Sequence, residues 1–199
     1  MDLVSEIQKF IDGVSPRLNE RFENREKILL MARELIRLSG ETISLSHRKD
    51  RDKALKKYQE ALEKSKQILA VISNFPELLY GDVGTAFQEL SEATVILSLY
   101  FGERLLTSYD LNIPETYYIM GIADAIGEMR RKILEDLRNG KLDEAEKTYS
   151  IMEDLYNILW TLEYPKALVP GLRQKIDALR RLLEETYHDL FLAKISLKT

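Results

Sequence analysis

The sequence predicts an all-α fold, a single-domain bundle of about six to seven helices. Apolar residues recur at steps of three and four over long stretches, which is the period of a helix face. No stretch alternates between apolar and polar residues as a half-buried strand does. The five prolines fall at the edges of the periodic stretches. Because no long linker interrupts the pattern, we expect residues 1–199 to form one domain.

The N-terminal region is expected to hold a short helix over residues 3–11 and then to break. Ser15 followed by Pro16 is typical of a helix start, with serine as the N-cap and proline at the first helical position. A long helix should follow. Its apolar positions are Leu18, Phe22, Leu29, Ala32, Ile36 and Ile43.

Five further helices are expected after this long one. Asp82 can cap a helix that follows Gly81, and Asn112-Ile113-Pro114-Glu115 is a second start signal. Asn139-Gly140 is a stop signal, because glycine suits the left-handed cap of a helix. The segment over residues 87–99 is apolar nearly all round, so we expect this helix at the centre of the bundle. The periodic stretches cover residues 58–72, 87–99, 122–137, 142–162 and 172–192.

The composition excludes several classes of site. The chain has no cysteine and only two histidines, which excludes disulfides, thiolate zinc sites and multi-histidine metal sites. A metal site would have to be built from oxygen ligands, which favours Mg²⁺, Mn²⁺ or Ca²⁺. No apolar run approaches the length of a membrane span, and the N-terminus lacks the features of a signal peptide. We therefore expect a cytoplasmic protein with no membrane contact.

Charge is distributed unevenly along a chain whose net charge is −4. Residues 16–66 carry 14 Lys or Arg and 9 Asp or Glu, so this region is basic and the remainder is acidic. A basic arm beside an acidic body is one interpretation. The other is a solvated pair of helices with two differently charged faces.

Four carboxylates form the most informative pattern in the sequence. Glu89 and Glu92 are three residues apart, and Asp124 and Glu128 are four apart, so each pair shares one helix face. Both pairs lie in segments that otherwise resemble core helices. If these helices pack face to face, four acids converge in a partly buried site, which must bind a cation or take up protons. The alternative is that these acids lie on solvated faces, as most acids do.

Such a cluster is suited to metal-assisted cleavage of a phosphodiester. Two divalent ions can activate a water, hold the non-bridging oxygens and stabilise the leaving oxygen. We expect Glu89, Glu92, Asp124 and Glu128 to be both the metal ligands and the catalytic residues, with Mg²⁺ or Mn²⁺ as cofactor. Glu128 is a candidate to accept a proton from the water as a general base.

Two glycines lie inside the helical pattern next to Asp124 and Glu128. Gly121 and Gly127 each weaken a helix relative to alanine, so their presence needs a reason. A small residue allows another helix, or a ligand, to approach the backbone closely. Tight helix packing alone would also explain them.

Several segments resemble the translin/Trax family. G-I-A-D-A-I-G-E-M-R-R at 121–131 is similar to the family signature G-x-x-D-x-x-G-E-hydrophobic-x-R. F-Q-E-L-S-E-A at 87–93 and S-H-R at 46–48 resemble the Trax branch. The stretch 172–190 is similar to the final helix of the family. One departure is D-A-I-G-E here, where the family often has a more hydrophobic D-L-T-G-E.

The resemblance implies a function as well as a fold. Members of the family are seven-helix proteins that assemble into hollow octamers and bind RNA and single-stranded DNA. The Trax branch is an endoribonuclease that uses Mg²⁺ on single-stranded RNA, and its catalytic acids match Glu89, Glu92, Asp124 and Glu128. The translin branch binds nucleic acid without those acids. We therefore expect a metal-dependent endoribonuclease in a homo-oligomeric, octameric shell, with a non-catalytic RNA- or DNA-binding protein, or a helical scaffold, as alternatives.

Nucleic acid would then contact the basic arm and the residues that follow Glu128. Arg130, Arg131 and Lys132 are placed to hold substrate phosphate near the metals, although pairing with Glu135 or Asp136 at helical spacing is equally compatible with the sequence. Phosphate contacts of this kind make binding depend on salt. The expected nucleic-acid contacts are Arg21, Arg25, Arg33, Arg37, His47, Arg48, Arg130 and Arg131.

Overall fold

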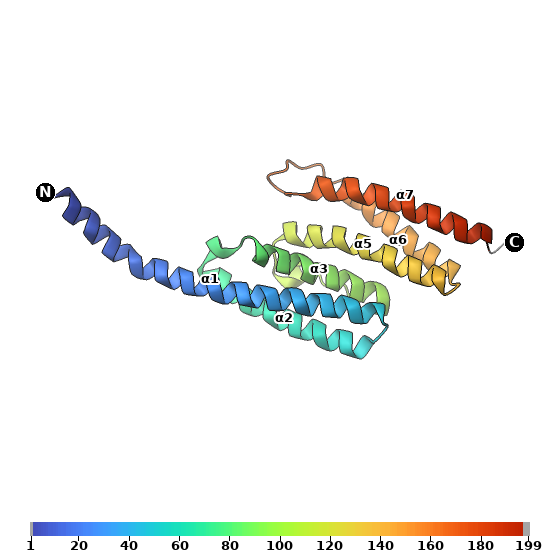
Figure 1. The fold of residues 1–199 in the computed structure, drawn as a ribbon, viewed down its shortest axis with the longest axis horizontal. Coiled ribbons are helices and arrows are strands. Elements are labelled where there is room, and N and C mark those ends of the chain that lie inside the picture. The colour runs from blue at the N-terminus through green and yellow to red at the C-terminus, as the bar shows by residue number, and fades with distance from the viewer. Residues whose placement is uncertain (1, 197–199) are drawn as a thin grey trace.

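The computed structural model describes residues 2–196, and its regular structure is entirely helical (Figure 1). This confirms the all-α prediction. Seven α-helices and one short 3₁₀ helix, η1, make up this part of the chain. Their bounds are α1 Leu3–His47, α2 Arg51–Asn74, η1 Pro76–Leu78, α3 Asp82–Phe101, α4 Ser108–Leu111, α5 Glu115–Arg138, α6 Leu142–Trp160 and α7 Leu172–Ser196.

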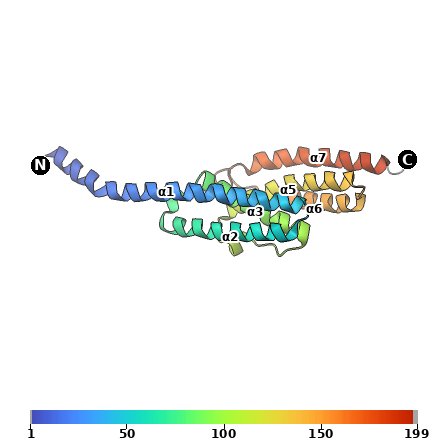
Figure 2. The same cartoon turned by 60° about the horizontal axis from the view of Figure 1, so that its bottom comes forward.

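Helix α1 runs for 45 residues without a break, so the predicted short helix over 3–11 and the start at Ser15-Pro16 are wrong. Pro16 lies inside the helix, where it cannot donate a backbone hydrogen bond. The Ser15 hydroxyl donates instead to the carbonyl oxygen of Ile11, at 2.8 Å. This region is exposed, so water can satisfy the remaining backbone groups, and the helix continues through the proline and curves along its N-terminal part (Figures 1 and 2).

The N-terminal half of α1 extends beyond the rest of the bundle (Figures 1 and 2). Only the second half has a buried face, which begins at Ile28. Leu18 and Phe22, which the sequence pattern places on the apolar face, are 55% and 62% exposed. The apolar stripe therefore continues along this projecting half of α1, the arm, where no other part of residues 2–196 covers it.

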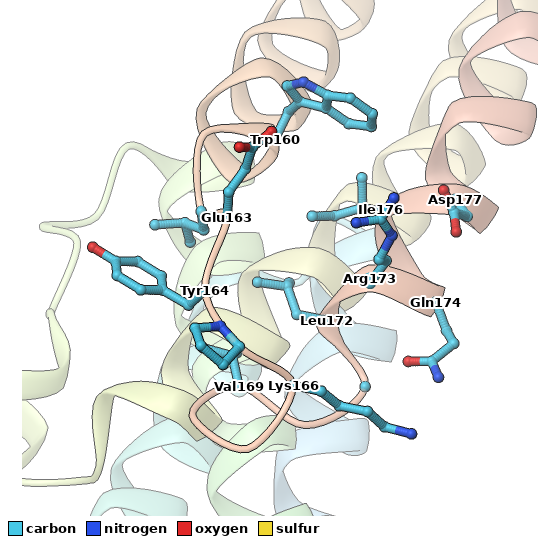
Figure 3. Close-up of a pocket in the computed structure, with 13 residues that line it drawn as sticks. Trp160, Glu163, Tyr164, Lys166, Val169, Leu172, Arg173, Gln174, Ile176 and Asp177 are labelled. Atoms are coloured by element: carbon cyan, nitrogen blue, oxygen red, sulfur yellow. The ribbon is translucent and has the colours of Figure 1, made fainter.

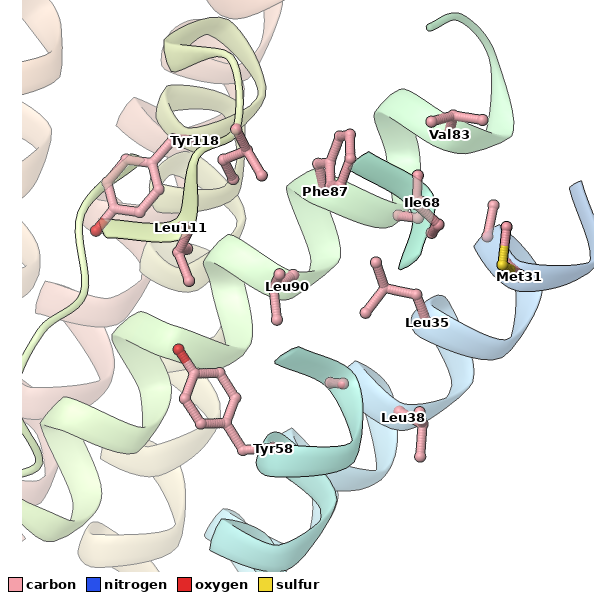
Figure 4. Packing of buried hydrophobic residues seen from close by; sticks show 14 of the residues in the cluster. Met31, Leu35, Leu38, Tyr58, Ile68, Val83, Phe87, Leu90, Leu111 and Tyr118 are labelled. Atoms are coloured by element: carbon pink, nitrogen blue, oxygen red, sulfur yellow. The ribbon is translucent and has the colours of Figure 1, made fainter. Parts of the chain in front are cut away.

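The remaining helices pack side by side around α3 and α5. Helix α1 packs against α2 and α3, α3 packs against α5, and α5 packs against α6 and α7. Figure 4 shows one of the two cores, where Leu35 of α1 and Ile68 of α2 face Phe87 and Leu90 of α3. The second core joins α3 and α5 to α6 and α7. Helix α3 thus contributes to both cores, which explains why its sequence is apolar nearly all round.

Some of the predicted helix ends differ slightly from the observed ones. Gly81 occupies the N-cap position of α3, so Asp82 is the first helical residue and not the cap. Helix α5 begins at Glu115, directly after Pro114. It ends at Arg138, and Gly140 has the positive φ expected of the predicted stop signal. Within residues 2–196, no helix combines the length and apolar character needed to cross a bilayer.

Gly121 allows α3 and α5 to approach closely where the acids lie. A Cβ at this position would clash with the backbone oxygen of Gln88 and the Cβ of Ser91, and would lie 3.0 Å from the backbone nitrogen of Glu92. Gly121 is therefore explained by the close approach of another helix, α3, to the backbone of α5. Gly127 differs, because a Cβ there would meet nothing within 4 Å.

We expect Gly121→Ala to destabilise the protein and Gly127→Ala to stabilise it. In the first variant two backbones must move apart, which should cost about 2–3 kcal/mol of unfolding free energy. In the second, alanine improves helix propensity and should add roughly 0.5–1 kcal/mol. Urea unfolding of both variants tests the comparison, and equal effects would contradict the described α3–α5 contact.

Candidate active site

The α3–α5 contact brings the four predicted acids to one region of the bundle. Glu89 and Glu92 come from α3, and Asp124 and Glu128 come from α5. Glu92 is only 8% exposed, and the other three are partly buried. None of the four lies on a fully solvated face, which is where the alternative interpretation would place them.

The acids affect one another electrostatically. Burial raises the pKa of Glu92 to about 8, and the negative charges of Glu89, Asp124 and Glu128 add to this shift. Burial also raises the pKa of Glu89, with Asp124 as the next largest cause. Within residues 2–196 the Glu92 carboxyl makes no hydrogen bond or ion pair. The site therefore contains a buried carboxyl group that no positive side chain contacts directly.

Asp124 has two partners from within the chain. The Lys175 ammonium, from the first turns of α7, forms an ion pair with Oδ1, and the Gln88 amide donates to Oδ2. Sequence reasoning missed both residues. Both lie inside segments that resemble the family, Gln88 in F-Q-E-L-S-E-A at 87–93 and Lys175 in the stretch 172–190, and this was the signal that could have identified them.

Glu128 is held by a buried histidine. Its Oε2 lies 2.6 Å from Nε2 of His47, and the Tyr100 hydroxyl lies 2.7 Å from Nδ1 of the same ring. With its proton on Nε2, His47 donates to Glu128 and accepts from Tyr100. The hydrogen bond from His47 lowers the pKa of Glu128, which keeps this carboxylate ionised.

This placement corrects the prediction for His47. The residue is 4% exposed, so it does not belong to an outer surface that binds nucleic acid. The last turn of α1 packs against the rest of the bundle, and Ile43 and Ser46 on that turn are buried as well. His47 is instead part of the surroundings of the acids.

Arg130 also differs from both sequence-based interpretations. Its guanidinium donates to the Thr186 hydroxyl and to the Asp189 carboxylate, each at 2.8 Å, and so connects α5 to α7. It pairs with neither Glu135 nor Asp136, because it points away from them toward α7. Arg131 is largely exposed, and its nearest acid is Glu128, at 3.9 Å.

The other predicted basic residues lie along α1, where Arg25 is partly buried and the rest are exposed. Four of these arginines have an acidic neighbour: Arg21 pairs with Glu77, Arg25 with Glu26, Arg33 with Asp82 and Arg37 with Glu41. Within the described chain Arg48, at the C-terminal end of the helix, has no ion-pair partner. Such exposed pairs are weak, so these arginines stay available to an anionic ligand.

No group of three acidic or histidine side chains among residues 2–196 is gathered tightly enough to hold one metal ion. The side chains point partly toward Lys175 and His47 instead. Like charges repel, and these carboxylates pair with the basic groups within reach. The backbone brings the donors to one region, but the side chains must turn to converge.

A separate cavity of about 700 Å³ lies under the connection between α6 and α7 (Figure 3). Trp160 and Tyr164 border it on one side, and Leu172 and Ile176 of α7 line it on another. None of the four acids lines this cavity. Trp160 and Tyr164 are 47% and 62% exposed, so neither belongs to the core.

Comparison with known proteins gives several similar chains. An uncharacterized protein from Methanocaldococcus jannaschii is 37% identical over 168 residues, which cover 83% of this chain and 74% of that protein. The structure of the AfC3PO–duplex RNA complex has a TM-score of 0.87 and 31% identity, covering 94% of this chain and 97% of that chain. No family model matches.

Two further C3PO structures share the fold. The crystal structure of AfC3PO has a TM-score of 0.87 and 30% identity over 95% of this chain and 99% of that one. Apo-NeC3PO has a TM-score of 0.84, covering 92% of this chain and 96% of that one. Its sequence identity of 22% supports the fold alone. These similarities agree with the resemblance to the translin/Trax family found in the sequence.

Proposed function

Because this chain belongs to the translin/Trax family, the family of the C3PO structures, we propose that it is a metal-dependent endoribonuclease. The proposed metal ligands and catalytic residues are Glu89, Glu92, Asp124 and Glu128. The observation that carries the proposal is the buried Glu92 carboxyl, whose pKa is raised by burial and by the charges of three further acids and which no positive side chain contacts directly. In a nuclease such a carboxyl can bind the metal ion, whereas a helical scaffold does not need a buried acid without a partner.

The donor set suits a divalent cation. All four groups supply carboxylate oxygens, the ligands that Mg²⁺ and Mn²⁺ prefer. A cation would also offset the repulsion that raises the pKa values of Glu89 and Glu92. Because no three of these groups converge as the side chains lie, binding requires Asp124 and Glu128 to turn from their present partners.

A bound divalent ion would supply an activated water and stabilise the charge on the phosphate. The residues of the chain have separate tasks. Glu128 would accept a proton from the water, and the hydrogen bond from His47 keeps its carboxylate ionised until the metal binds. Tyr100 fixes the orientation of the His47 ring.

RNA is the proposed substrate, and the AfC3PO complex contains duplex RNA. Single-stranded RNA is the substrate that the family resemblance implies, so both forms are candidates. The arginines Arg21, Arg25, Arg33, Arg37 and Arg48, with Arg131 near Glu128, are the proposed phosphate contacts. Their contribution should make binding weaken steeply with salt.

We also propose that the protein works as a homo-oligomer, an octamer by analogy with the family, with each chain as one domain. The exposed apolar residues on the arm of α1 support this idea, because a soluble monomer rarely leaves such a stripe uncovered. These residues are Leu3, Val4, Ile7, Phe10, Ile11, Leu18 and Phe22.

The test is incubation of labelled single-stranded and duplex RNA with the purified protein. We expect cleavage with Mg²⁺ or Mn²⁺ and none in excess chelator, while binding persists in a gel shift. The alternative, a non-catalytic binding protein, predicts a shift that weakens with salt and no cleavage under any metal condition. A scaffold without a nucleic-acid role predicts neither.

A further inference from the structure

Lys175 is a positive charge placed among the four acids. It lies near the start of α7, and its ammonium forms an ion pair with Asp124 on α5. Its charge also opposes the upward pKa shifts of Glu89 and Glu92 on α3, so its field reaches both pairs of acids. The side chain is 27% exposed, which leaves the ammonium accessible to a ligand.

Both oxygens of Asp124 are engaged by the chain itself, one by Lys175 and the other by Gln88. A divalent ion that uses Asp124 must therefore displace the lysine from at least part of this carboxylate. An ammonium group is a monovalent cation with no fixed geometry, so it can leave when a doubly charged ion takes its place. Its long and flexible stem allows it to remain near the site.

The ion pair is not the only link between α5 and α7. Arg130 connects the same two helices through Thr186 and Asp189, and apolar residues of both helices share one core. The bundle therefore does not depend on Lys175 for the placement of α7. This argues against a purely structural role for a lysine that lies among acids.

We propose that Lys175 occupies the cation position at Asp124 until a divalent metal binds, and then contacts a phosphate oxygen of the RNA. The inference rests on the proposed function. Once the metal neutralises the carboxylates, the substrate phosphate is the nearest anion for the displaced ammonium. Contact between an ammonium and a phosphate oxygen stabilises the charge that develops during cleavage.

The test uses Lys175→Met in the full-length protein, which keeps the length of the side chain and removes its charge. Without the competing cation, Mn²⁺ titrated by electron paramagnetic resonance should bind roughly threefold to tenfold more tightly, since loss of a nearby like charge favours the ion. At saturating Mn²⁺, RNA cleavage should fall roughly tenfold to a hundredfold. A variant that binds metal better and cleaves more slowly separates this role from a structural one.

Lys194→Met is the matched control. Lys194 also lies on α7 and pairs with an acid of a neighbouring helix, Glu146, at 2.7 Å. It does not face the four acids, so neither metal affinity nor cleavage should change. Lys175→Arg keeps a cation and should restore most of the cleavage that Lys175→Met loses.

Two results would overturn the proposal. Unchanged or weaker Mn²⁺ binding in Lys175→Met excludes competition for Asp124, and unchanged cleavage at saturating Mn²⁺ excludes the phosphate contact. If the wild-type protein binds Mn²⁺ but cleaves no RNA, the proposed function fails by itself. In that case the affinity for RNA is measured at saturating Mn²⁺ in place of cleavage. If Lys175→Met then binds RNA as tightly as the wild type, the contact between Lys175 and the phosphate is excluded.

Discussion

Asp124→Asn is expected to reduce RNA cleavage by about a hundredfold to a thousandfold, the range seen when a charged or hydrogen-bonding group at a reaction centre is removed. Asparagine keeps the shape of aspartate but loses the negative charge that attracts a divalent ion. Both oxygens of Asp124 also have a partner within the chain, because Lys175 and Gln88 both bind it. Its loss should therefore disturb metal binding and the position of Lys175 together.

The control for this variant is Asp154→Asn, the same change at an exposed position of α6. It should cleave RNA at the wild-type rate. Glu89→Gln should behave like Asp124→Asn, since both remove one carboxylate from the cluster. Folded Asp124→Asn and Glu89→Gln proteins with wild-type cleavage rates would remove the metal-site proposal.

Glu92→Gln is expected to stabilise the metal-free protein above pH 8. The pKa of Glu92 is raised to about 8, whereas an unperturbed glutamate in the unfolded chain titrates near 4.5. Between these two values the folded state keeps a proton that the unfolded state releases, so the wild-type protein loses stability as pH rises through this window. Glutamine carries no charge at any pH and avoids this loss.

Unfolding with urea in the presence of chelator should show the difference. Near pH 5 the variant and the wild type should differ little, and at pH 8.5 the variant should gain on the order of 2–4 kcal/mol, since each pKa unit corresponds to about 1.4 kcal/mol. With excess Mg²⁺ the stability that the variant gains over the wild type should shrink or reverse, because only the wild type has all four metal ligands. A pH-independent difference would contradict a buried, repelled Glu92 carboxylate.

Glu128→Gln is expected to change the free energy of unfolding with pH in the opposite direction. The pKa of Glu128 is lowered by the hydrogen bond from His47, so this carboxylate stabilises the fold above its unfolded pKa and loses that effect as pH falls. Its replacement should destabilise the metal-free protein at neutral pH and matter less in acid. Two glutamates of the same cluster are thus expected to respond to pH in opposite directions.

The fold could be predicted from the sequence because local patterns determine most of it. Apolar spacing located the long helices, and the uniformly apolar character of α3 predicted its central place. The helix start predicted at Ser15-Pro16 failed for a physical reason. An exposed helix tolerates a proline where water and the Ser15 hydroxyl can satisfy the freed backbone groups, and this depends on the solvation of the arm and not on the local sequence.

The site was only partly predictable. Helical spacing identified the two pairs of acids, and the family resemblance indicated their chemistry. The roles of Lys175 and Tyr100 depend on contacts between residues about 50 positions apart, which no local pattern reports. His47 was assigned to the nucleic-acid surface because it lies at the end of a basic helix, but the packing of that last turn buries it.

The central claim is that Glu89, Glu92, Asp124 and Glu128 together bind the divalent ion that RNA cleavage requires. Crystals soaked with Mn²⁺ and measured at a wavelength where manganese scatters anomalously test it directly. The account predicts an anomalous peak between α3 and α5 within about 2.5 Å of oxygens from at least three of these carboxylates. No peak between those helices in a protein that cleaves RNA with Mn²⁺ would contradict it.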